Sequence, residues 1–324
     1  MINADGSAAG PAPAALPSVV VAPRAVWRQP VGGGHYLHVE DCGDAHGVPV
    51  VFLHGGPGAG CQPWQRALFE PHDWRAVFVD QRGAGRSTPL GGLCANTTAD
   101  LLQDLEVIRR RLGIARWVLA GGSWGATLAL LYAQTFPERC RGLLLRGTFL
   151  ARAQDIAWVY GADGVARERP AAWHAFLAHL PVAERADPVA AFHRRLTGDD
   201  AATAAAAAQA WQAWGAALVG SAAAAAAPTP QALAQARIEA HYVRHGCFIE
   251  AGRVLRDAPA LAGIPGILLH GTHDGVCPLA QAQALHALWP MAELRCLDGV
   301  GHVLGEPAMR AAWVQAARDL LQRV

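Results

Sequence analysis

A serine at position 123 stands in a pattern that could make it a nucleophile. Residues 121–125 read G-G-S-W-G and match G-x-S-x-G, a sharp turn that lifts a serine hydroxyl out between a strand and a helix. The apolar run at 116–120 predicts the strand, and the apolar run at 126–133 predicts the helix. Small neighbours suit such a turn, because its backbone is squeezed and takes unusual dihedral angles. We therefore predict that Ser123 is a catalytic nucleophile. The competing interpretation is a glycine-rich turn with an incidental serine.

The partners of this serine follow from its chemistry. A serine hydroxyl is a weak nucleophile until a histidine accepts its proton, and that histidine needs a carboxylate to orient it. The chain contains no lysine, which excludes a serine–lysine pair, a Schiff base and a Walker A loop. With this kind of turn, the chain order is serine, acid, histidine. Asp274 and His302 fit, because each follows a late apolar strand in a glycine-rich loop. Asp298 ranks below Asp274 as the acid, since it lies only four residues before His302, and His273 is interpreted as a loop residue.

An early glycine-rich loop could stabilise the negative oxygen that acyl transfer develops. Such an oxyanion needs backbone N–H donors that are already in place. Residues 54–58 read H-G-G-P-G directly after an apolar run, and Gly56 can expose its amide there. We predict that Gly56 and Trp124, the residue after the nucleophile, supply the two donors. The glycine clusters near residues 58 and 83 lack the spacing of a dinucleotide-binding loop.

A pair of histidines offers the main alternative, a metal site. His241 and His245 have the i, i+4 spacing of a metal-binding helix, but the glutamate of H-E-x-x-H is missing between them. We interpret the pair as part of a solvated helix face. The sequence therefore predicts neither a metal nor a cofactor.

Composition limits the remaining classes of function. The chain has 324 residues, a hydrophobic fraction of 52% and a net charge of +1, without a basic stripe or an apolar run of membrane-spanning length. These features argue against nucleic acid or a membrane as the main partner. Seven cysteines without a C-x-x-C pair predict free thiols and a cytoplasmic location. Residues 1–22, rich in alanine, proline and glycine, are expected to form a disordered tail. The sequence carries no signal for an oligomeric state.

The order of apolar segments predicts an α/β fold with an insertion. Apolar runs suited to buried parallel strands occur at 49–53, 76–80, 117–120, 143–146, 263–270 and 293–297. An apolar stripe predicts an amphipathic helix at 101–112, and a final helix is expected at 308–322. The alternation stops at 151–250, which is rich in tryptophan and alanine and has helical periodicity. We predict a mostly parallel sheet with helices on both faces, built from residues 23–150 and 251–324, and a helical cap formed by 151–250.

Taken together, these motifs resemble those of the proline iminopeptidases, which are serine peptidases of the α/β-hydrolase fold with a helical cap. The similarity runs from about residue 26 to the C-terminus. Its motifs are H-G-G-P-G at 54–58, D-Q-R-G-A-G-R-S at 80–87, G-G-S-W-G at 121–125, L-R-G-T-F at 145–149, R-R-L-T at 194–197 and R-I-E-A-H-Y at 237–242. The resemblance implies an aminopeptidase that releases an N-terminal residue, preferably proline, through an acyl-enzyme. It also implies that Ser123, Asp274 and His302 form the catalytic triad, with Gly56 and Trp124 as oxyanion donors.

The resemblance also implies three substrate-binding residues. Glu239 matches a cap glutamate that binds the free α-amino group of the substrate. A carboxylate can recognise an ammonium group directly, through a charge-assisted hydrogen bond. Arg146 and Phe149 match residues beside the proline pocket. From the residues alone, Glu239 could be an exposed carboxylate on a cap helix, and Arg146 could tie down carbonyls or a carboxylate.

Two positions depart from the family pattern. Gly215 stands where the family motif W-x-x-W-E has a second amine-binding glutamate, and Val159 stands where an aromatic residue is usual. Asp199 and Asp200 are the nearby carboxylates that could replace the missing one. These departures bear on specificity for proline and leave the hydrolytic chemistry intact. They motivate the alternative of a small-molecule esterase or amidase, and a non-catalytic binding protein is a more remote alternative.

Overall fold

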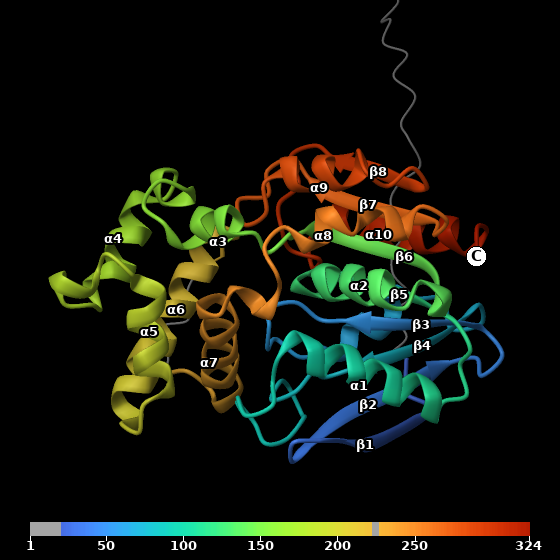
Figure 1. Ribbon diagram of the computed structural model, residues 1–324, viewed down its shortest axis with the longest axis horizontal. Coiled ribbons are helices and arrows are strands. Elements are labelled where there is room, and N and C mark those ends of the chain that lie inside the picture. The colour runs from blue at the N-terminus through green and yellow to red at the C-terminus, as the bar shows by residue number, and fades with distance from the viewer. Residues whose placement is uncertain (1–20, 222–226) are drawn as a thin grey trace, which may run out of the picture.

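The computed structural model describes residues 21–221 and 227–324, which build an eight-stranded sheet and the helices around it (Figure 1). The strands are β1 (Ala25–Gly32), β2 (His35–Gly43), β3 (Val48–Leu53), β4 (Trp74–Val79), β5 (Trp117–Ser123), β6 (Cys140–Thr148), β7 (Gly266–Gly271) and β8 (Ala292–Leu297). Their order across the sheet is β1-β2-β4-β3-β5-β6-β7-β8. The pairs β1–β2 and β2–β4 are antiparallel and all other neighbours are parallel. The predicted α/β-hydrolase architecture is thus confirmed, whereas nearly all of the predicted tail 1–22 lies outside the described residues.

The six apolar runs correspond to β3 to β8, whereas β1 and β2 were not predicted. The physical reason is their place at the edge of the sheet. β1 is mostly exposed and its residues alternate in burial, while β2 buries Glu40 and Asp41 instead of an apolar run. Arginines pair with both carboxylates, Arg66 with Glu40 at 2.8 Å and Arg75 with Asp41 at 3.0 Å. An apolar-run criterion misses strands of this kind.

The central strands are buried on both faces and send alternate side chains to opposite sides. In β5, Trp117 and Leu119 pack on the same side as α1 (Thr98–Arg111) and α2 (Trp124–Thr135). Val118 and Ala120 pack on the other side, against α10 (Pro307–Leu321). This alternation is the two-residue period of a β-strand. It explains why β5 is a continuous apolar run, since neither of its faces meets solvent.

Two helices show how local sequence sets their ends. α1 begins one turn before the predicted residue 101, because Thr97 and Asp100 form a capping box. The Asp100 N–H donates to the Thr97 hydroxyl at 3.3 Å, and the Thr97 N–H donates to the Asp100 carboxylate at 3.0 Å. Gly113, with φ of 66°, follows its C-terminus. α10 closely matches the final helix expected at 308–322.

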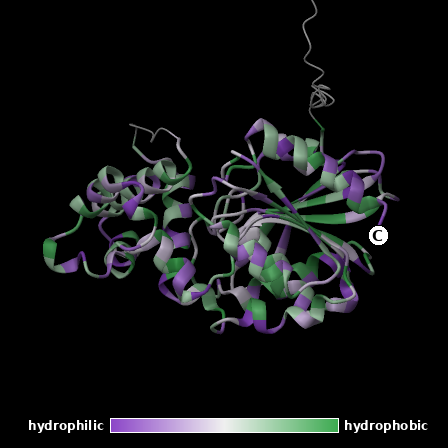
Figure 2. Cartoon of the chain, turned by 90° about the horizontal axis from the view of Figure 1, so that it is seen from above, coloured by the Kyte–Doolittle hydropathy of each residue, from purple (hydrophilic) through white to green (hydrophobic). Residues whose placement is uncertain are grey.

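A separate group of helices lies beyond the carboxyl ends of the parallel strands, on the left in Figure 1. These helices are α3 (Ala153–Tyr160), α4 (Pro170–Ala178), α5 (Pro188–Thr197), α6 (Ala201–Leu218) and α7 (Pro230–Arg244). They share a core of aromatic side chains, in which Phe176 stacks on Phe192 at 4.4 Å and Trp173 packs on Trp214 at 5.2 Å. Figure 2 shows this group beside the sheet, with hydrophobic residues in both parts. Of the residues that the structure describes between 151 and 250, none lies in a strand.

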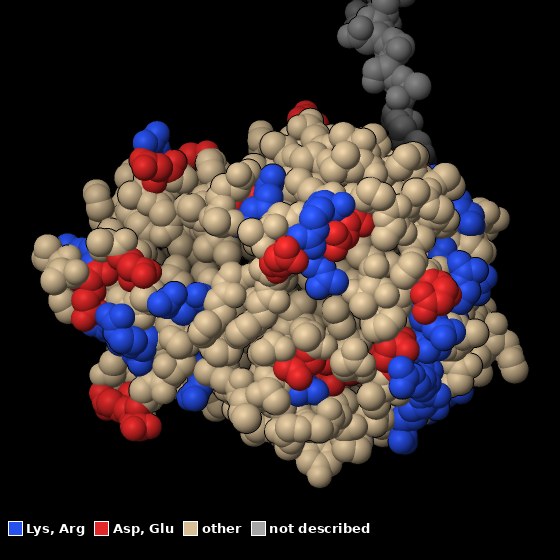
Figure 3. Space-filling model, viewed as in Figure 1, with Lys and Arg blue, Asp and Glu red and all other residues tan. Residues whose placement is uncertain are grey.

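The short helices of the described fold include α8 (Arg253–Arg256), α9 (Leu279–His286) and the 3-10 helix η1 (Pro63–Leu68). No helix within the described ranges is long and apolar enough to cross a membrane. Figure 3 shows acidic and basic side chains intermingled on one face of the molecule.

Candidate active site

Ser123 lies at the sharp turn between β5 and α2. Its φ of 57° and ψ of −122° are strained values for a residue with a side chain. The turn needs glycine on both sides: a Cβ on Gly121 would lie 2.6 Å from the carbonyl oxygen of Gly125, and one on Gly125 would lie 2.0 Å from that of Leu53. The Ser123 side chain is only partly buried. This is the geometry of a nucleophile elbow, in which strain holds the hydroxyl outward.

Asp274 and His302 form a hydrogen-bonded pair at the ends of neighbouring strands. The Nδ1 atom of His302 lies 2.7 Å from Oδ2 of Asp274, whose side chain is fully buried. The backbone N–H groups of Val276 and Cys277 donate to Oδ1 of Asp274 at 2.9 and 2.8 Å. Burial raises the pKa of Asp274, but His302 and the Cys277 N–H outweigh burial and hold the pKa below its usual value. An ionised Asp274 keeps the proton on Nδ1 of His302, which leaves Nε2 free to accept another.

Several contacts bring Ser123 to the same edge of the sheet as this pair. Ser123 pairs with Thr148 of β6, and a Cβ on the preceding Gly147 would lie 3.0 Å from the His302 ring and 3.3 Å from Asp274. The buried Cys277 thiol lies against the Ser123 hydroxyl: burial raises the pKa of the thiol, and this contact lowers it. Within the described residues no hydrogen bond joins Ser123 to His302. In free enzymes such catalytic contacts are often long and tighten only with substrate.

The rival residues near this pair have other surroundings. Asp298 is exposed and accepts a hydrogen bond from the Thr272 hydroxyl at 3.2 Å. His273 is also exposed, on the loop beside Asp274. The His302 ring therefore has Asp274 as its carboxylate partner.

A buried network connects the H-G-G-P-G loop to the residue after the nucleophile. Gly56 has φ of 109°, a conformation that favours glycine. The neighbouring His54 is buried, and its Nε2 accepts a hydrogen bond from the Gln81 backbone N–H at 3.0 Å. The Gln81 side chain donates to the His54 carbonyl at 3.0 Å and accepts from the Trp124 indole N–H at 2.9 Å. Gln81 thus holds together the two segments that carry Gly56 and Trp124.

Glu239 lies on α7, the cap helix that covers this loop. A Cβ on Gly58 would lie 3.2 Å from Ile238, one residue before Glu239. Glu239 is partly buried, and burial raises the pKa of its carboxyl from 4.5 to about 7. Contacts with Trp211 and with the Tyr160 hydroxyl, 3.4 Å away, oppose this rise. Glu239 is therefore not an exposed surface carboxylate but a poorly solvated group in an aromatic setting.

Arg146 and Phe149 lie at the end of β6 and just beyond it. Arg146 is buried, which lowers its pKa, and it donates a hydrogen bond to the backbone carbonyl of His302. Gly122 makes room for it, since a Cβ there would lie 2.4 Å from the guanidinium. The carbonyl of Phe149 accepts a hydrogen bond from Thr127 of α2 at 2.7 Å. The Arg146 side chain thus anchors the histidine loop, and Phe149 joins the start of the cap to α2.

The two departures from the family pattern have different surroundings. Gly215 is exposed on α6, and a Cβ there would have no atom within 4 Å. Asp200 caps the N-terminus of α6, and Asp199 precedes it. At the rise of an α-helix, Asp200 lies about 22 Å from Gly215, so neither aspartate replaces the missing carboxylate. Val159 is buried in the cap core, where its carbonyl accepts a hydrogen bond from Trp214 at 3.1 Å.

The structure places several residues here that were not predicted from the sequence as site residues. They are Gln81, Tyr160 beside Glu239, Cys277 beside Ser123, and Trp158, whose indole donates to the Gly275 carbonyl at 3.0 Å. Arg146 was singled out, and its hydrogen bond to the His302 carbonyl corresponds to the second interpretation given for it, a side chain that ties down carbonyls. Gln81 could have been found, because it directly follows the apolar run of β4 at the edge where the other site residues lie. The others depend on contacts between distant segments.

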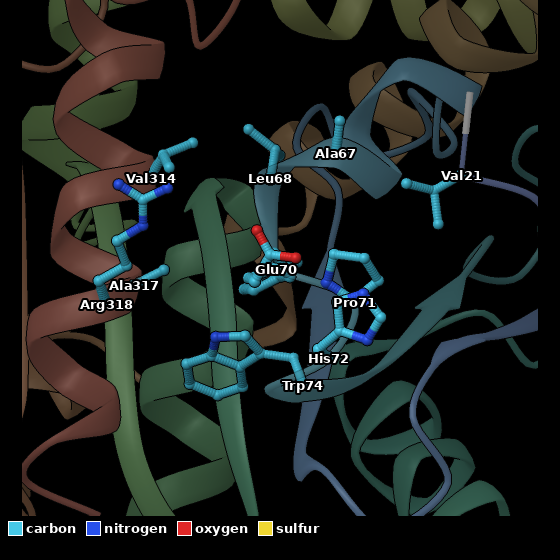
Figure 4. A pocket seen from close by; sticks show the side chains of 11 residues that line it. Val21, Ala67, Leu68, Glu70, Pro71, His72, Trp74, Val314, Ala317 and Arg318 are labelled. Carbon is cyan, nitrogen blue, oxygen red and sulfur yellow. The ribbon is translucent and has the colours of Figure 1, made fainter. Parts of the chain in front are cut away.

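A well-formed pocket lies elsewhere, between η1 and α10 (Figure 4). It has a volume of about 270 Å³, and Leu68, Trp74 and Ala317 contribute to its apolar lining. None of the candidate site residues lines this pocket, so we assign the pocket no part in the chemistry.

Comparisons with known proteins agree with this geometry. Residues 48–307 match the alpha/beta hydrolase fold family, which defines the class. Proline iminopeptidases of Xylella fastidiosa and Xanthomonas citri are 49% and 46% identical, over 86% and 87% of this chain and 90% and 92% of theirs. A proline iminopeptidase-related protein from Thermus thermophilus superposes with a TM-score of 0.59 at 25% identity, over 93% of this chain and 99% of that one. The chain belongs to the proline iminopeptidase family of the alpha/beta hydrolases.

Replacing Gln81 by leucine is expected to lower kcat about 10- to 100-fold. Loss of an entire oxyanion donor costs about 100- to 1,000-fold in kcat. A leucine at this position would loosen the two segments that carry the predicted donors, Gly56 and Trp124, without removing either N–H group. The matched control is Gln315→Leu on the exposed face of α10, which should leave kcat unchanged. Steady-state kinetics at one pH, with circular dichroism to confirm folding, measure the effect. An unchanged kcat in a folded Gln81→Leu protein would show that the network does not support catalysis.

Proposed function

We propose that this protein is a serine aminopeptidase that releases an N-terminal residue, preferably proline, from peptides. The observation that carries the proposal is the position of Glu239, a poorly solvated carboxyl on the cap helix that covers the H-G-G-P-G loop beside Ser123. The relatives named proline iminopeptidase, at 49% and 46% identity over most of the chain, support it.

We infer the following order of chemical steps. Ser123 Oγ attacks the carbonyl carbon of the first residue while Nε2 of His302 takes its proton. The backbone N–H groups of Gly56 and Trp124 stabilise the resulting oxyanion. His302 then gives its proton to the departing peptide amine, which leaves an acyl-enzyme on Ser123. A water molecule then attacks the acyl carbon while His302 takes its proton. The bond from that carbon to Ser123 Oγ breaks, His302 returns the proton to Oγ, and the amino acid leaves.

Selectivity for a free N-terminus depends in this proposal on Glu239. A single carboxylate serves here, because Gly215 supplies no side chain and Asp200 is about 22 Å away along α6. Loss of one charged hydrogen bond weakens recognition by about 1–3 kcal/mol. We therefore propose an aminopeptidase that binds the substrate amine more weakly than a site with two carboxylates does.

The direct test compares naphthylamides of proline, alanine and N-blocked proline. We expect turnover of the prolyl substrate above that of the alanyl substrate, and little turnover of the blocked one. Equal turnover of blocked and free prolyl substrates would contradict the exopeptidase assignment. The exposed Gly215 favours a second candidate, a small-molecule esterase or amidase. Strong hydrolysis of short-chain p-nitrophenyl esters, together with none of prolyl naphthylamide, would favour that candidate.

The pKa of Glu239 predicts how peptide binding depends on pH. Because burial raises this pKa to about 7, the carboxyl is neutral below pH 7 and charged above it. The dissociation constant of a prolyl dipeptide should therefore fall about tenfold per pH unit from pH 5 toward 7 and then level off. The Ser123→Ala variant is suited to this measurement by calorimetry, because it binds the peptide without turning it over.

Glu239→Gln in the same background is the control for this prediction. Glutamine keeps the shape of the neutral carboxyl and cannot ionise, so its affinity should be weak and independent of pH between 5 and 8. If the dissociation constant depends on pH in the same way with Glu239 and with glutamine at this position, Glu239 is not the group that binds the amine.

We further propose two features of the molecule as a whole. Residues 23–150 and 251–324 form the catalytic domain and 151–250 the cap, a division supported by the aromatic core that α3 to α7 share. A cytoplasmic location is supported by the cysteines, all seven of which are free thiols. The proposed partner is a peptide or small molecule with a free N-terminus, rather than nucleic acid or a membrane.

A further inference from the structure

Three histidines converge on the cap, away from Ser123. His193 lies on α5, His241 lies in the last turn of α7 beside it, and His245 directly follows the end of α7 (Figure 1). Each offers one ring nitrogen, and the three nitrogen atoms lie within 4.8 Å of one another. Within the described parts of the chain, this is the one cluster of histidine, cysteine or acidic side chains arranged closely enough to hold a metal ion.

The spacing of two of these nitrogen atoms already suits a tetrahedral metal. His193 Nε2 lies 3.4 Å from His241 Nδ1. A tetrahedral zinc ion with Zn–N bonds of 2.0–2.1 Å holds two ligand nitrogens about 3.4 Å apart. The third nitrogen needs only a small side-chain movement, which is available to His245 because it is exposed.

The tautomer of His245 is also suitable for a metal ligand. Its Nδ1 lies 2.8 Å from the backbone carbonyl oxygen of His241 and must donate to it, because a carbonyl can only accept. The lone pair is therefore on Nε2, which is free to bind a metal. Histidines that bind metals in proteins almost always donate their other ring N–H in this way.

The surroundings favour a metal that prefers neutral nitrogen ligands. Each of the three side chains offers an imidazole nitrogen, and no carboxylate or thiol of the described residues belongs to the cluster. Nearby arginines oppose a cation, although Arg194 is paired with Glu184 at 3.0 Å. A neutral site of three imidazoles without a carboxylate suits zinc, copper, nickel or cobalt rather than magnesium or calcium.

We propose that His193, His241 and His245 bind one divalent transition-metal ion of the zinc class, with a fourth position open to solvent. The ion joins α5 to α7 and so fixes two cap helices that are otherwise held by packing. His241 lies two residues after Glu239, and the metal therefore braces the helix that carries this carboxyl. The proposal rests on the histidine geometry and not on the proposed peptidase activity.

Direct binding to the full chain without a histidine tag tests the proposal. The protein is freed of metal with a chelator and titrated with Co²⁺, whose visible absorption reports tetrahedral coordination, and Zn²⁺ is then added to displace it. We expect saturation at one ion per chain. In thermal unfolding, Zn²⁺ at about a hundredfold excess over its Kd should raise Tm by about 2–6 °C.

Two ligand variants and one control make the result specific. His193→Ala and His245→Ala should each weaken binding at least tenfold, since even an outer-shell partner of a metal ligand is worth about 10- to 100-fold. His245 is exposed, so its replacement should leave the metal-free Tm unchanged. His174→Ala, at an exposed position on α4, should bind as the unmodified chain does.

Three outcomes would overturn the proposal. The first is the absence of saturable Co²⁺ binding, and the second is equal affinity in the unmodified chain and both ligand variants. The third concerns the arginines: if inorganic phosphate raises Tm in the unmodified chain but not in His193→Ala, while Zn²⁺ has no effect, the cluster is an anion site.

Discussion

Replacing Ser123 by alanine is expected to lower kcat for prolyl naphthylamide by about 10⁴- to 10⁶-fold. In the proposed mechanism, the change removes the oxygen that forms the acyl-enzyme and leaves water as the only nucleophile. Alanine fills nearly the same volume as serine, so the protein should remain folded. Some rate above that in water should persist, because the proposed oxyanion donors, the N–H groups of Gly56 and Trp124, are not changed.

Labelling with a fluorophosphonate makes the Ser123 experiment decisive. The unmodified chain should be labelled once, and Ser123→Ala should not be labelled. Ser221→Ala changes an exposed serine of the cap and serves as the matched control, with unchanged labelling and kcat. Residual turnover within tenfold of the unmodified enzyme would mean that another group is the nucleophile. Unlabelled native protein without any hydrolysis would favour the non-catalytic binding protein.

Replacing Asp274 by asparagine is expected to lower kcat by about 10⁴-fold. The backbone N–H groups of Val276 and Cys277 occupy Oδ1, so the oxygen of an asparagine would remain there and its NH₂ group would face His302. That NH₂ group donates to Nδ1 and forces the histidine proton onto Nε2. In this tautomer His302 cannot accept the proton of Ser123, although the geometry is nearly unchanged.

The rival acid provides the control for this variant. Asp298→Asn alters an exposed carboxylate in the loop that precedes His302, and kcat should stay within about twofold of the unmodified value, as for most surface substitutions. Steady-state kinetics of both variants on prolyl naphthylamide decide between the two residues. A large loss in Asp298→Asn with little loss in Asp274→Asn would reverse the assignment.

Much of the fold could be predicted from the sequence, because its signals are local. The strands β3 to β8 are buried on both faces and are therefore apolar runs, and the cap has the periodicity and tryptophans of packed helices. The edge strands β1 and β2 could not be found in the same way. Glu40 and Asp41 are buried in β2 only because arginines from η1 and β4 reach them. Sequence spacing carries no signal for such pairs.

The same distinction between local signals and contacts of distant segments applies to the candidate site. The sequence by itself determined the strained turn at Ser123, since a glycine pattern of five residues dictates the local backbone, and it limited the proton acceptor to histidine. Tertiary structure decided which carboxylate meets His302, how Gln81 joins the two donor segments, and that Arg146 anchors the histidine loop. It also brought His193 to His241 and His245 across 48 residues of chain. Backbone conformation depends on near neighbours, whereas these contacts form only when packing brings distant segments together.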